Sequence, residues 1–463
     1  NNVSVSNISL NLHMNKEEYK INAISPIDGR YSDKCNPLSD YFSEFALIKY
    51  RVFVEIQYFT ELANIPLPQL KELTDSDKKT IENISKKFST EDALRVKNIE
   101  KDINHDVKAV EYFIKEEFDK INLSKYKEFI HFGLTSQDIN NTAVPLMLKD
   151  SINKVIMPSF VKVQKVINTM SKSLKNIPMI ARTHGQPATP TTFGKEFNVF
   201  EERLINQIET LASIQNNGKF GGASGNLNAH YVSYPEINWD EFADNFLKNI
   251  GLKRSKPTTQ IDHYDNMAAI FHNLSRINTV LIDLCRDIWH YISINYLVQK
   301  ANKKEVGSSA MPHKVNPIDF ENAEGNLMLA NSQYIFLAEK LPVSRLQRDL
   351  TDSTVSRNIG VPLSHTKIAL ESIIKGLGKI DVNKSVIEND LDNNWAVVSE
   401  AIQTVLRREN IPNPYELLKD LTRGNDDITK ESIAKFINSL PVSDKVKKEL
   451  LSISPHNYLG NAR

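Results

Sequence analysis

A serine-containing segment near residue 310 carries the side chains best suited to chemistry. The segment from Gly307 to Asn316 holds a glycine, two serines and a proline between stretches of helix-forming sequence. Because these residue types are unfavourable inside a helix, we predict a loop, and loops between rigid elements often carry function. Its hydroxyls can handle a proton, while Lys314 and Asn316 are donors suited to a carboxylate. A polar turn between two helices explains the same composition without any chemistry.

A histidine beside an arginine and a glycine is the second candidate. The stretch from Arg182 to Pro187 follows a predicted helix that Pro178 ends. His184 is therefore expected on a loop or at a helix entrance. An imidazole there can act as a general acid, although a lone histidine is often a structural residue.

Two further polar groups are expected at the N-termini of helices. Asn104, His105 and Asp106 precede an amphipathic pattern, and Asp106 would stabilise the first turn of that helix. His105 beside an aspartate could instead be an oriented imidazole near a substrate. The stretch beginning Thr135-Ser136 is a strong N-cap signal. Because helix N-termini also bind anions, a cap and a ligand contact are compatible there.

An arginine-rich stretch follows residue 344. Three arginines, Arg345, Arg348 and Arg357, stand among several hydroxyl side chains that include Ser353. Such a stretch can be a solvated face. Guanidinium groups also match the geometry of phosphate, so the stretch is a candidate phosphate site. The turn-forming segment 25–31 ends in Arg30 and Tyr31, which suit a phosphate or a ribose.

Composition narrows the class of protein. The 57 basic residues balance the 57 acidic ones, so no overall field favours nucleic acid or an anionic membrane. Two widely separated cysteines, Cys35 and Cys285, fit a reducing compartment and exclude a disulfide framework. No apolar run has the length of a membrane span, and the first residues lack the features of a signal peptide. We expect a cytoplasmic protein.

The hydrophobic pattern predicts long helices that would position these candidates. Between Thr258 and Val306 there is neither glycine nor proline, and apolar residues recur every three or four positions. One long helix is predicted there, with others over about 158–174, 192–214 and 321–341. Regular strand alternation is missing, so we predict an all-α fold built around a long helix bundle.

Composition shifts suggest domain boundaries within the 463 residues. Gly376 and Gly378, followed by a charged run, mark an exit from the bundle. The Asn- and Ser-rich start predicts a disordered or expression-derived extension. The expected boundaries are 1–20 for the extension, 21–130 for an N-terminal helical domain, 131–378 for the central bundle with a mobile catalytic loop near 303–317, and 379–463 for a C-terminal helical domain.

Taken together, these motifs resemble the bacterial-type adenylosuccinate lyase family of the fumarase and aspartase superfamily. The likeness runs from Ser25 to Tyr458. Besides the loop, it rests on the segments 25–31, 104–106, 135–138, 183–186, 258–261 and 350–357. The resemblance implies three helical domains and a homotetramer whose central bundle and active sites are shared between subunits.

The resemblance also implies a reaction and its residues. Fumarate would be eliminated from adenylosuccinate to give AMP, and from succinyl-aminoimidazole-carboxamide ribotide to give the carboxamide ribotide, without a metal or organic cofactor. Ser308 would be the base and His184 the acid. The choice between Ser308 and Ser309, and between His184 and His105, stays open. The implied substrate-binding residues are Arg30, Tyr31, Asn104, His105, Asp106, Thr135, Ser136, Gln260, Lys314, Asn316, Asn322, Arg348, Ser353 and Arg357.

Two other readings remain beside this one. Argininosuccinate lyase or another fumarate-releasing relative shares the loop, but it recognises no phosphate and would not need the arginine-rich stretch. A non-catalytic structural relative would not need Ser308, His184, Lys314 and Asn316 together. Nucleic acid and membrane are not expected partners.

Overall fold

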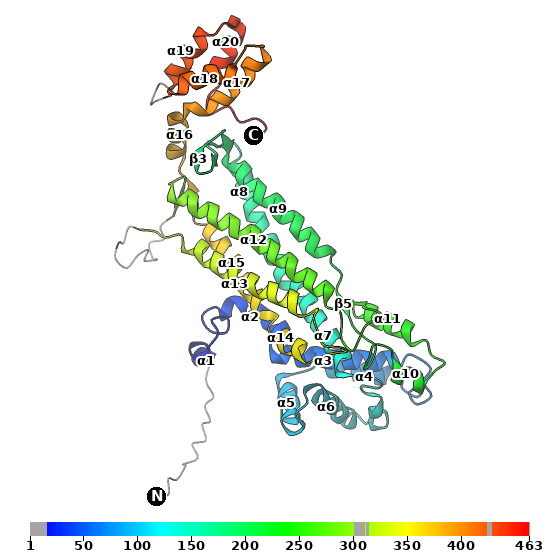
Figure 1. The fold of residues 1–463 in the computed structure, drawn as a ribbon. Coiled ribbons are helices and arrows are strands. Elements are labelled where there is room, and N and C mark those ends of the chain that lie inside the picture. The colour runs from blue at the N-terminus through cyan, green and yellow to red at the C-terminus, as the bar shows by residue number, and fades with distance from the viewer. Residues whose placement is uncertain (1–15, 301–310, 312–313, 424–427, 463) are drawn as a thin grey trace. The chain divides into compact units, whose positions relative to one another are not determined.

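Helices dominate the computed structural model of the chain (Figure 1). The structure describes residues 16–300, 311, 314–423 and 428–462. Most of the predicted extension over 1–20 and part of the predicted catalytic loop near 303–317 lie outside these residues. By compactness the chain divides into two units, each treated by itself below. The domain boundaries predicted from the sequence differ from this division and stay a prediction.

The first unit comprises 1–159, 210–278 and 326–371. Most of its elements are helices, and its two strands, β5 and β6, form one parallel pair. The elements that fall wholly inside it are α1 (Lys16–Asn22), α2 (Ser32–Phe42), α3 (Glu44–Leu62), α4 (Asp75–Lys86), α5 (Thr90–Ile103), α6 (Asp106–Lys120), η1 (Ser124–Phe129), α7 (Ser136–Ser151), η2 (Ile152–Ile156), β5 (Asn217–Gly218), α10 (Asn228–Ser233), α11 (Trp239–Asn249), β6 (Lys253–Arg254) and α14 (Thr351–Ser356).

Helix α3 forms the centre of the first unit and packs against α4, α6 and α7. Its start is fixed by Ser43, whose hydroxyl accepts the N–H of Ala46 at 3.1 Å. The helix buries apolar residues on most of its surface, and Phe59 meets Phe118 of α6 edge to face at 4.9 Å between ring centroids. This rigid packing fixes the polar side chains that α3 carries near its N-terminus.

The second unit comprises 160–209, 279–325 and 372–463. Its strands span two or three residues and form two-stranded antiparallel pairs, and α17 to α20 form a small group of helices around their own core (Figure 1). The elements wholly inside it are β1 (Pro178–Met179), β2 (Arg182–Thr183), β3 (Gln186–Pro187), β4 (Thr191–Thr192), β7 (Leu297–Gln299), β8 (Ile380–Val382), α16 (Lys384–Asn393), η3 (Trp395–Val398), α17 (Ser399–Arg408), α18 (Pro414–Arg423), α19 (Lys430–Ser439) and α20 (Asp444–Leu451).

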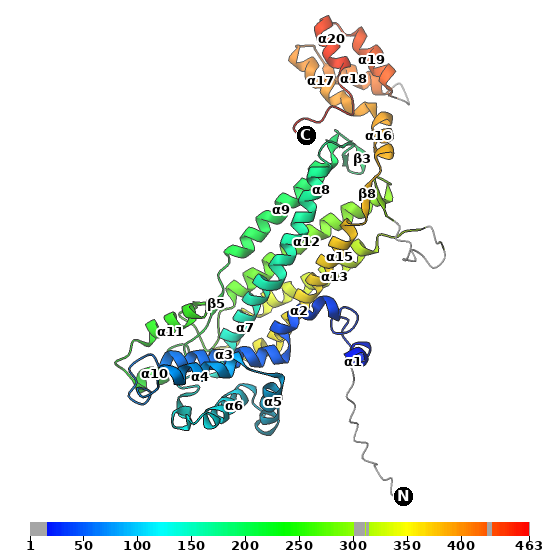
Figure 2. The ribbon, with the colours of Figure 1, turned by 180° about the vertical axis from the view of Figure 1, so that it is seen from behind.

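Five long helices contain residues of both units. They are α8 (Met157–Ser173), α9 (Phe193–Ser213), α12 (Asp265–Ser293), α13 (Ile318–Lys340) and α15 (Gly360–Leu377). Within the second unit, α8 and α9 run side by side (Figure 2), where Gln164 of α8 donates to Glu201 of α9 at 2.7 Å. The all-α prediction is confirmed, and the helices predicted over 158–174, 192–214 and 321–341 are present within a few residues.

The single helix predicted between Thr258 and Val306 is wrong at both ends, because α12 is shorter. At its start, Tyr264 has a left-handed backbone with a φ of 61°, which interrupts the helix before Asp265. At its end, Asn295 also has a φ of 61°, and the N–H of Tyr296 donates to the carbonyl of Tyr291. This is the usual C-terminal cap of a helix, and apolar periodicity alone does not register it.

Candidate active site

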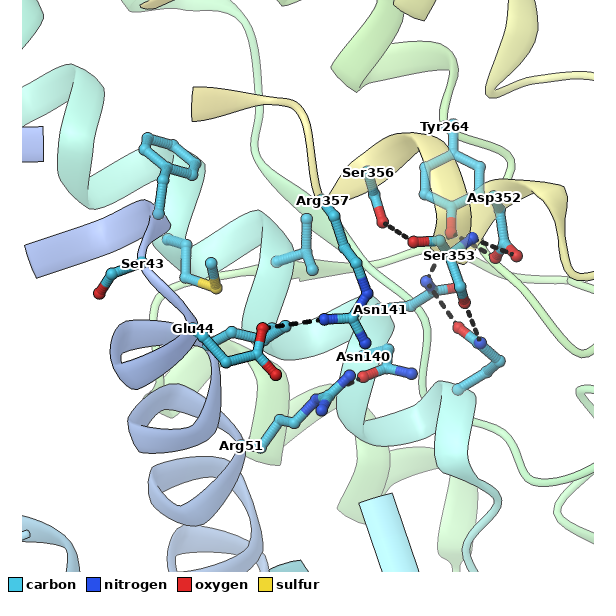
Figure 3. Close-up of a pocket in the computed structure, with 15 residues that line it drawn as sticks. Ser43, Glu44, Arg51, Asn140, Asn141, Tyr264, Asp352, Ser353, Ser356 and Arg357 are labelled. Atoms are coloured by element: carbon cyan, nitrogen blue, oxygen red, sulfur yellow. Dashed lines mark hydrogen bonds and ion pairs between the residues drawn. The ribbon is translucent and has the colours of Figure 1, made fainter. Parts of the chain in front are cut away.

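A pocket in the first unit gathers polar side chains from four parts of the chain (Figure 3). It is lined by residues from 42–51, from 137–147, from 352–357, and by Tyr264. Helices α3, α7 and α14 therefore supply most of its surface. Two candidates predicted from the sequence, Ser353 and Arg357, line it directly.

Two arginines share one carboxylate beside this pocket. Asp106, at the start of α6, accepts from Arg51 at 2.8 Å and from Arg357 at 3.0 Å through the same oxygen, Oδ2. Its other oxygen accepts the N–H of Val107 at 2.9 Å, so Asp106 also stabilises the first turn of the helix, as predicted. Burial is the largest single influence and would raise the pKa of Asp106, but the charge and hydrogen bond of Arg51, the N–H of Val107 and the charge of Arg357 together lower it. Asp106 thus holds Arg357 by an ionised carboxylate.

His105 caps α6 and keeps one ring nitrogen for other contacts. Its Nδ1 accepts the N–H of Lys108 at 3.1 Å, which makes His105 the N-cap of the helix. A neutral His105 consequently carries its proton on Nε2. Asn104, at a φ of 52°, ends α5 immediately before it. The three predicted residues therefore occupy a tight junction between two helices.

Arg348 and Ser353 contact each other across the start of α14. The guanidinium Nη2 of Arg348 donates to the hydroxyl of Ser353 at 2.9 Å. Gln137 of α7 donates to the same hydroxyl at 3.3 Å. Fixed donors of this kind suit a phosphate, since charge-assisted hydrogen bonds contribute about 1.5 to 3 kcal/mol each.

The predicted cap at Thr135 is confirmed, and a buried ion pair supports it. Asp138 accepts the N–H of Thr135 at 2.8 Å at the start of α7, whose first residue is Ser136. The same carboxylate accepts from the ammonium of Lys219 at 2.7 Å and from the N–H of Gly221 at 2.8 Å. Asp138 and Lys219 are fully buried. The helix start is therefore locked to the segment 219–222.

Three other candidates of the first unit lie on turns. Gln260 donates its amide to the carbonyl of Ala223 at 3.0 Å. Arg30 and Tyr31 follow a turn in which the N–H of Tyr31 donates to Pro26 at 2.8 Å, and Tyr31 then caps α2. The guanidinium carbon of Arg30 lies 5.7 Å from the centroid of the Tyr31 ring.

His184 lies at the tip of a β-hairpin in the second unit, not at a helix entrance. Strands β2 and β3 pair, and the two residues between them, His184 and Gly185, have φ values of 53° and 75°. Positive values at both positions are typical of a type I′ turn, which two-residue hairpins prefer. Arg182 anchors the hairpin by donating to Asp390 at 2.7 Å. His184 is exposed.

The remaining candidates of the second unit are described in part. Ser308 lies outside the described residues. Lys314 is exposed, and its N–H donates to the carbonyl of Met311 at 3.0 Å. Asn316 is half-buried just before α13. On α13, the side-chain oxygen of Asn322 accepts from Ser372 at 2.9 Å.

Sequence reasoning missed several residues that shape the pocket. Arg51 is 4% exposed and donates to Asn140 and Asp106, while Glu44 accepts from Arg357 at 3.0 Å. A signal was available, because Arg51 and Glu55 interrupt the apolar side of α3. Asp352 was overlooked within a segment that was itself singled out. In the described ranges no three His, Cys, Asp or Glu side chains group as a metal site requires.

Solved structures of low sequence identity share this fold. The chain resembles a fumarate lyase from Mesorhizobium sp. BNC1 with a TM-score of 0.72 and 19% identity, covering 93% of this chain and 95% of that one. A 3-carboxy-cis,cis-muconate lactonizing enzyme from Pseudomonas putida gives a TM-score of 0.69 at 20% identity, covering 92% and 94%. These likenesses establish the fold class, which is that of the fumarate lyases.

Sequence comparisons narrow the class further. Residues 29–331 match the family model described as Lyase, and residues 344–459 match the one described as Adenylosuccinate lyase C-terminal. The chain is 56% identical to adenylosuccinate lyase of Dictyostelium discoideum, covering 99% of this chain and 98% of that one. It is 46% identical to the adenylosuccinate lyase of Escherichia coli K12, covering 96% and 97%. The chain belongs to the adenylosuccinate lyase family, which confirms the resemblance found in its motifs.

Proposed function

We propose that this protein is a carbon-nitrogen lyase that eliminates fumarate from adenylosuccinate to give AMP. The same elimination from succinyl-aminoimidazole-carboxamide ribotide would give the carboxamide ribotide. The enzyme would then catalyse two steps of purine biosynthesis. Family membership supports the reaction class. The choice of a nucleotide substrate rests on two anchored guanidinium groups. Arg348 donates to Ser353, and Arg357 donates to Asp106. A nucleotide phosphate needs fixed donors of this kind.

The elimination needs a base and an acid. Ser308 removes a proton from the carbon beside a carboxylate, and the electron pair left behind forms the double bond of fumarate. The carbon-nitrogen bond breaks, and His184 gives its proton to the departing nitrogen. General acid-base help of this kind contributes roughly 10² to 10⁴ in rate for each group. A serine must be activated before it can act as a base, and we expect this activation to occur when the loop closes.

The other candidates divide between the two ends of the substrate. Proton removal adds negative charge to the neighbouring carboxylate, and pre-oriented donors stabilise that charge. We assign this role to Lys314 and Asn316, with help from Thr135, Ser136 and Gln260. The nucleotide end would be held by Arg30, Tyr31, Arg348, Ser353 and Arg357, whose binding energy aligns the reacting carbon. Asn104, His105, Asp106 and Asn322 complete the proposed contacts.

A cytoplasmic location belongs to the same proposal. Both cysteines are buried and unpaired by any disulfide, which suits a reducing compartment. Among the helices that the structure describes, none combines the length and apolarity that a bilayer crossing requires.

We also propose a homotetramer whose active sites draw on more than one subunit. Support comes from α13, where Met328, Leu329, Ile335 and Phe336 are 44–52% exposed within the first unit. They recur seven residues apart, which is the spacing of a helix seam that packs against another helix. The exposed position of His184 fits the same arrangement.

Sharing of sites predicts complementation between two inactive variants. Mixed tetramers of Ser308→Ala and His184→Ala should recover part of the wild-type activity, because some sites would then contain both intact residues. Fumarate release is measured after the subunits have been exchanged and mixed tetramers verified by mass. No recovery in such tetramers would contradict sharing.

Removing one guanidinium should weaken nucleotide binding more than catalysis. Arg348→Ala is expected to raise KM for adenylosuccinate by about tenfold or more, because one charge-assisted contact to the phosphate is lost. Arg95→Ala is the matched control, since Arg95 binds Glu116 and Glu117 away from the pocket. An unchanged KM in Arg348→Ala would remove its assigned role.

The proposal is tested by supplying two fumarate-yielding substrates separately. Purified protein should release fumarate from adenylosuccinate and not from argininosuccinate. Release only from argininosuccinate would favour that rival activity. Release from neither, by correctly folded protein, would favour a structural relative without catalysis.

A further inference from the structure

We propose that Tyr264 is a positioning residue that fixes the phosphate-binding side chains Arg348 and Ser353 by acting through Asp352. This inference rests on the proposed function, which assigns the substrate phosphate to those two side chains. Tyr264 itself would not touch the phosphate.

The hydroxyl of Tyr264 is held from two sides. It donates to Oδ2 of Asp352 at 3.0 Å and accepts from the amide of Asn141 at 2.7 Å. Both Tyr264 and Asp352 are 3% exposed, and both line the pocket (Figure 3). Burial raises the pKa of Tyr264 well above its usual value, so the hydroxyl stays neutral and remains a donor to the carboxylate.

Asp352, which the Tyr264 hydroxyl holds in place, contacts both phosphate-binding residues through its other oxygen. Its other oxygen, Oδ1, accepts the N–H of Ser353 at 2.7 Å and lies 3.5 Å from Nη2 of Arg348. That same Nη2 donates to the Ser353 hydroxyl. The carboxylate therefore stands between a neutral donor on one side and the guanidinium on the other.

The backbone around Tyr264 is built to keep the hydroxyl in place. A φ of 61° is unusual for an aromatic residue, and such conformations persist only where surrounding contacts impose them. Here the N–H of Tyr264 donates to Asp262 at 3.0 Å, and the N–H of Asp262 donates to Asn141 at 2.7 Å. Asn141 thus holds both the turn and the hydroxyl.

Loss of the hydroxyl would change how Asp352 competes for Arg348. A buried carboxylate must have its hydrogen bonds satisfied. Without the tyrosine as a donor, Asp352 would draw the guanidinium of Arg348 closer, at the expense of Ser353 and of a bound phosphate. Loss of the hydroxyl should therefore weaken the binding of ligands that carry a phosphate and spare ligands that do not.

Tyr264→Phe tests this with AMP and adenosine as probes, measured by calorimetry on the full-length protein. The substitution keeps the ring and removes one oxygen. We expect Kd for AMP to rise by about fivefold or more, consistent with a weakened charge-assisted contact, and Kd for adenosine to change by less than about twofold. A purely structural role would shift both ligands alike.

Two further variants make the result decisive. Tyr334→Phe is the control, because Tyr334 is fully buried in the same unit and its hydroxyl lies 3.1 Å from Thr366. Tyr334→Phe should change the affinity for neither ligand.

Asp352→Asn should reproduce the selective loss of affinity for AMP, and it replaces Tyr264→Phe if that variant does not fold. Equal effects on AMP and adenosine, or no effect on AMP, would overturn the assignment of Tyr264. Because these measurements need no turnover, absence of fumarate release by the wild type would instead sink the proposed function.

Discussion

Ser308→Ala and His184→Ala should each lower kcat for adenylosuccinate by at least about 100-fold, the lower bound expected when a base or an acid is removed. The base and the acid act only as the bonds change, so substrate affinity should be largely retained. Steady-state kinetics of fumarate release gives kcat and KM separately. His184 is exposed on a hairpin that Arg182 anchors to Asp390, so its substitution should leave folding intact.

The neighbouring serine and histidine provide matched controls. Ser309→Ala should change kcat by less than about tenfold if Ser308 is the base, since the two differ by one position in the same segment. His105→Ala should act mainly on KM if His184 is the acid. A loss confined to KM in Ser308→Ala or His184→Ala would reassign that residue to binding. A larger kcat loss in Ser309→Ala or His105→Ala would move the catalytic role to it.

Lys219→Met should lower the free energy of unfolding by about 3 to 5 kcal/mol, because removing one partner of a buried ion pair leaves the other charge uncompensated. Lys219 donates to Asp138 at 2.7 Å and to the carbonyl of Gly222 at 2.6 Å. Methionine nearly preserves the volume, so lost packing contributes little. Urea unfolding at matched protein concentration measures the change.

An exposed ion pair provides the comparison for this variant. Lys86 and Glu82 lie 2.6 Å apart on α4, with the Lys86 side chain 62% exposed. Lys86→Met should change the free energy of unfolding by less than about 1 kcal/mol. If Lys219→Met were as mild as Lys86→Met, the buried pair would not be the brace of α7 that its geometry indicates.

Local signals predicted the helix starts well. Thr135 was expected as an N-cap and the structure has it at that position, while Asp106 lies in the first turn of α6 as expected, because capping depends on residues only a few positions apart. Apolar periodicity likewise predicted α8, α9 and α13. It failed where a single left-handed residue bounds a helix, before the start of α12 at Tyr264 and after its end at Asn295, since periodicity contains no information on backbone φ.

Contacts between segments far apart in the chain could not be predicted from the sequence. Asp106 and Arg357 are 251 positions apart, yet their side chains form an ion pair. The candidate residues could be named from motifs, but the buried side chains that support their segments, Arg51, Tyr264 and Lys219, are placed by tertiary packing. His184 was expected on a loop or at a helix entrance, and the hairpin itself was not predicted, because its strands of two residues are too short to leave a strand pattern.

The most direct test is a stoichiometric assay of the wild-type protein with adenylosuccinate, in which fumarate and AMP are quantified together. Both products should appear in equimolar amounts. Correctly folded protein that forms neither, or that forms one without the other, would contradict the proposed function.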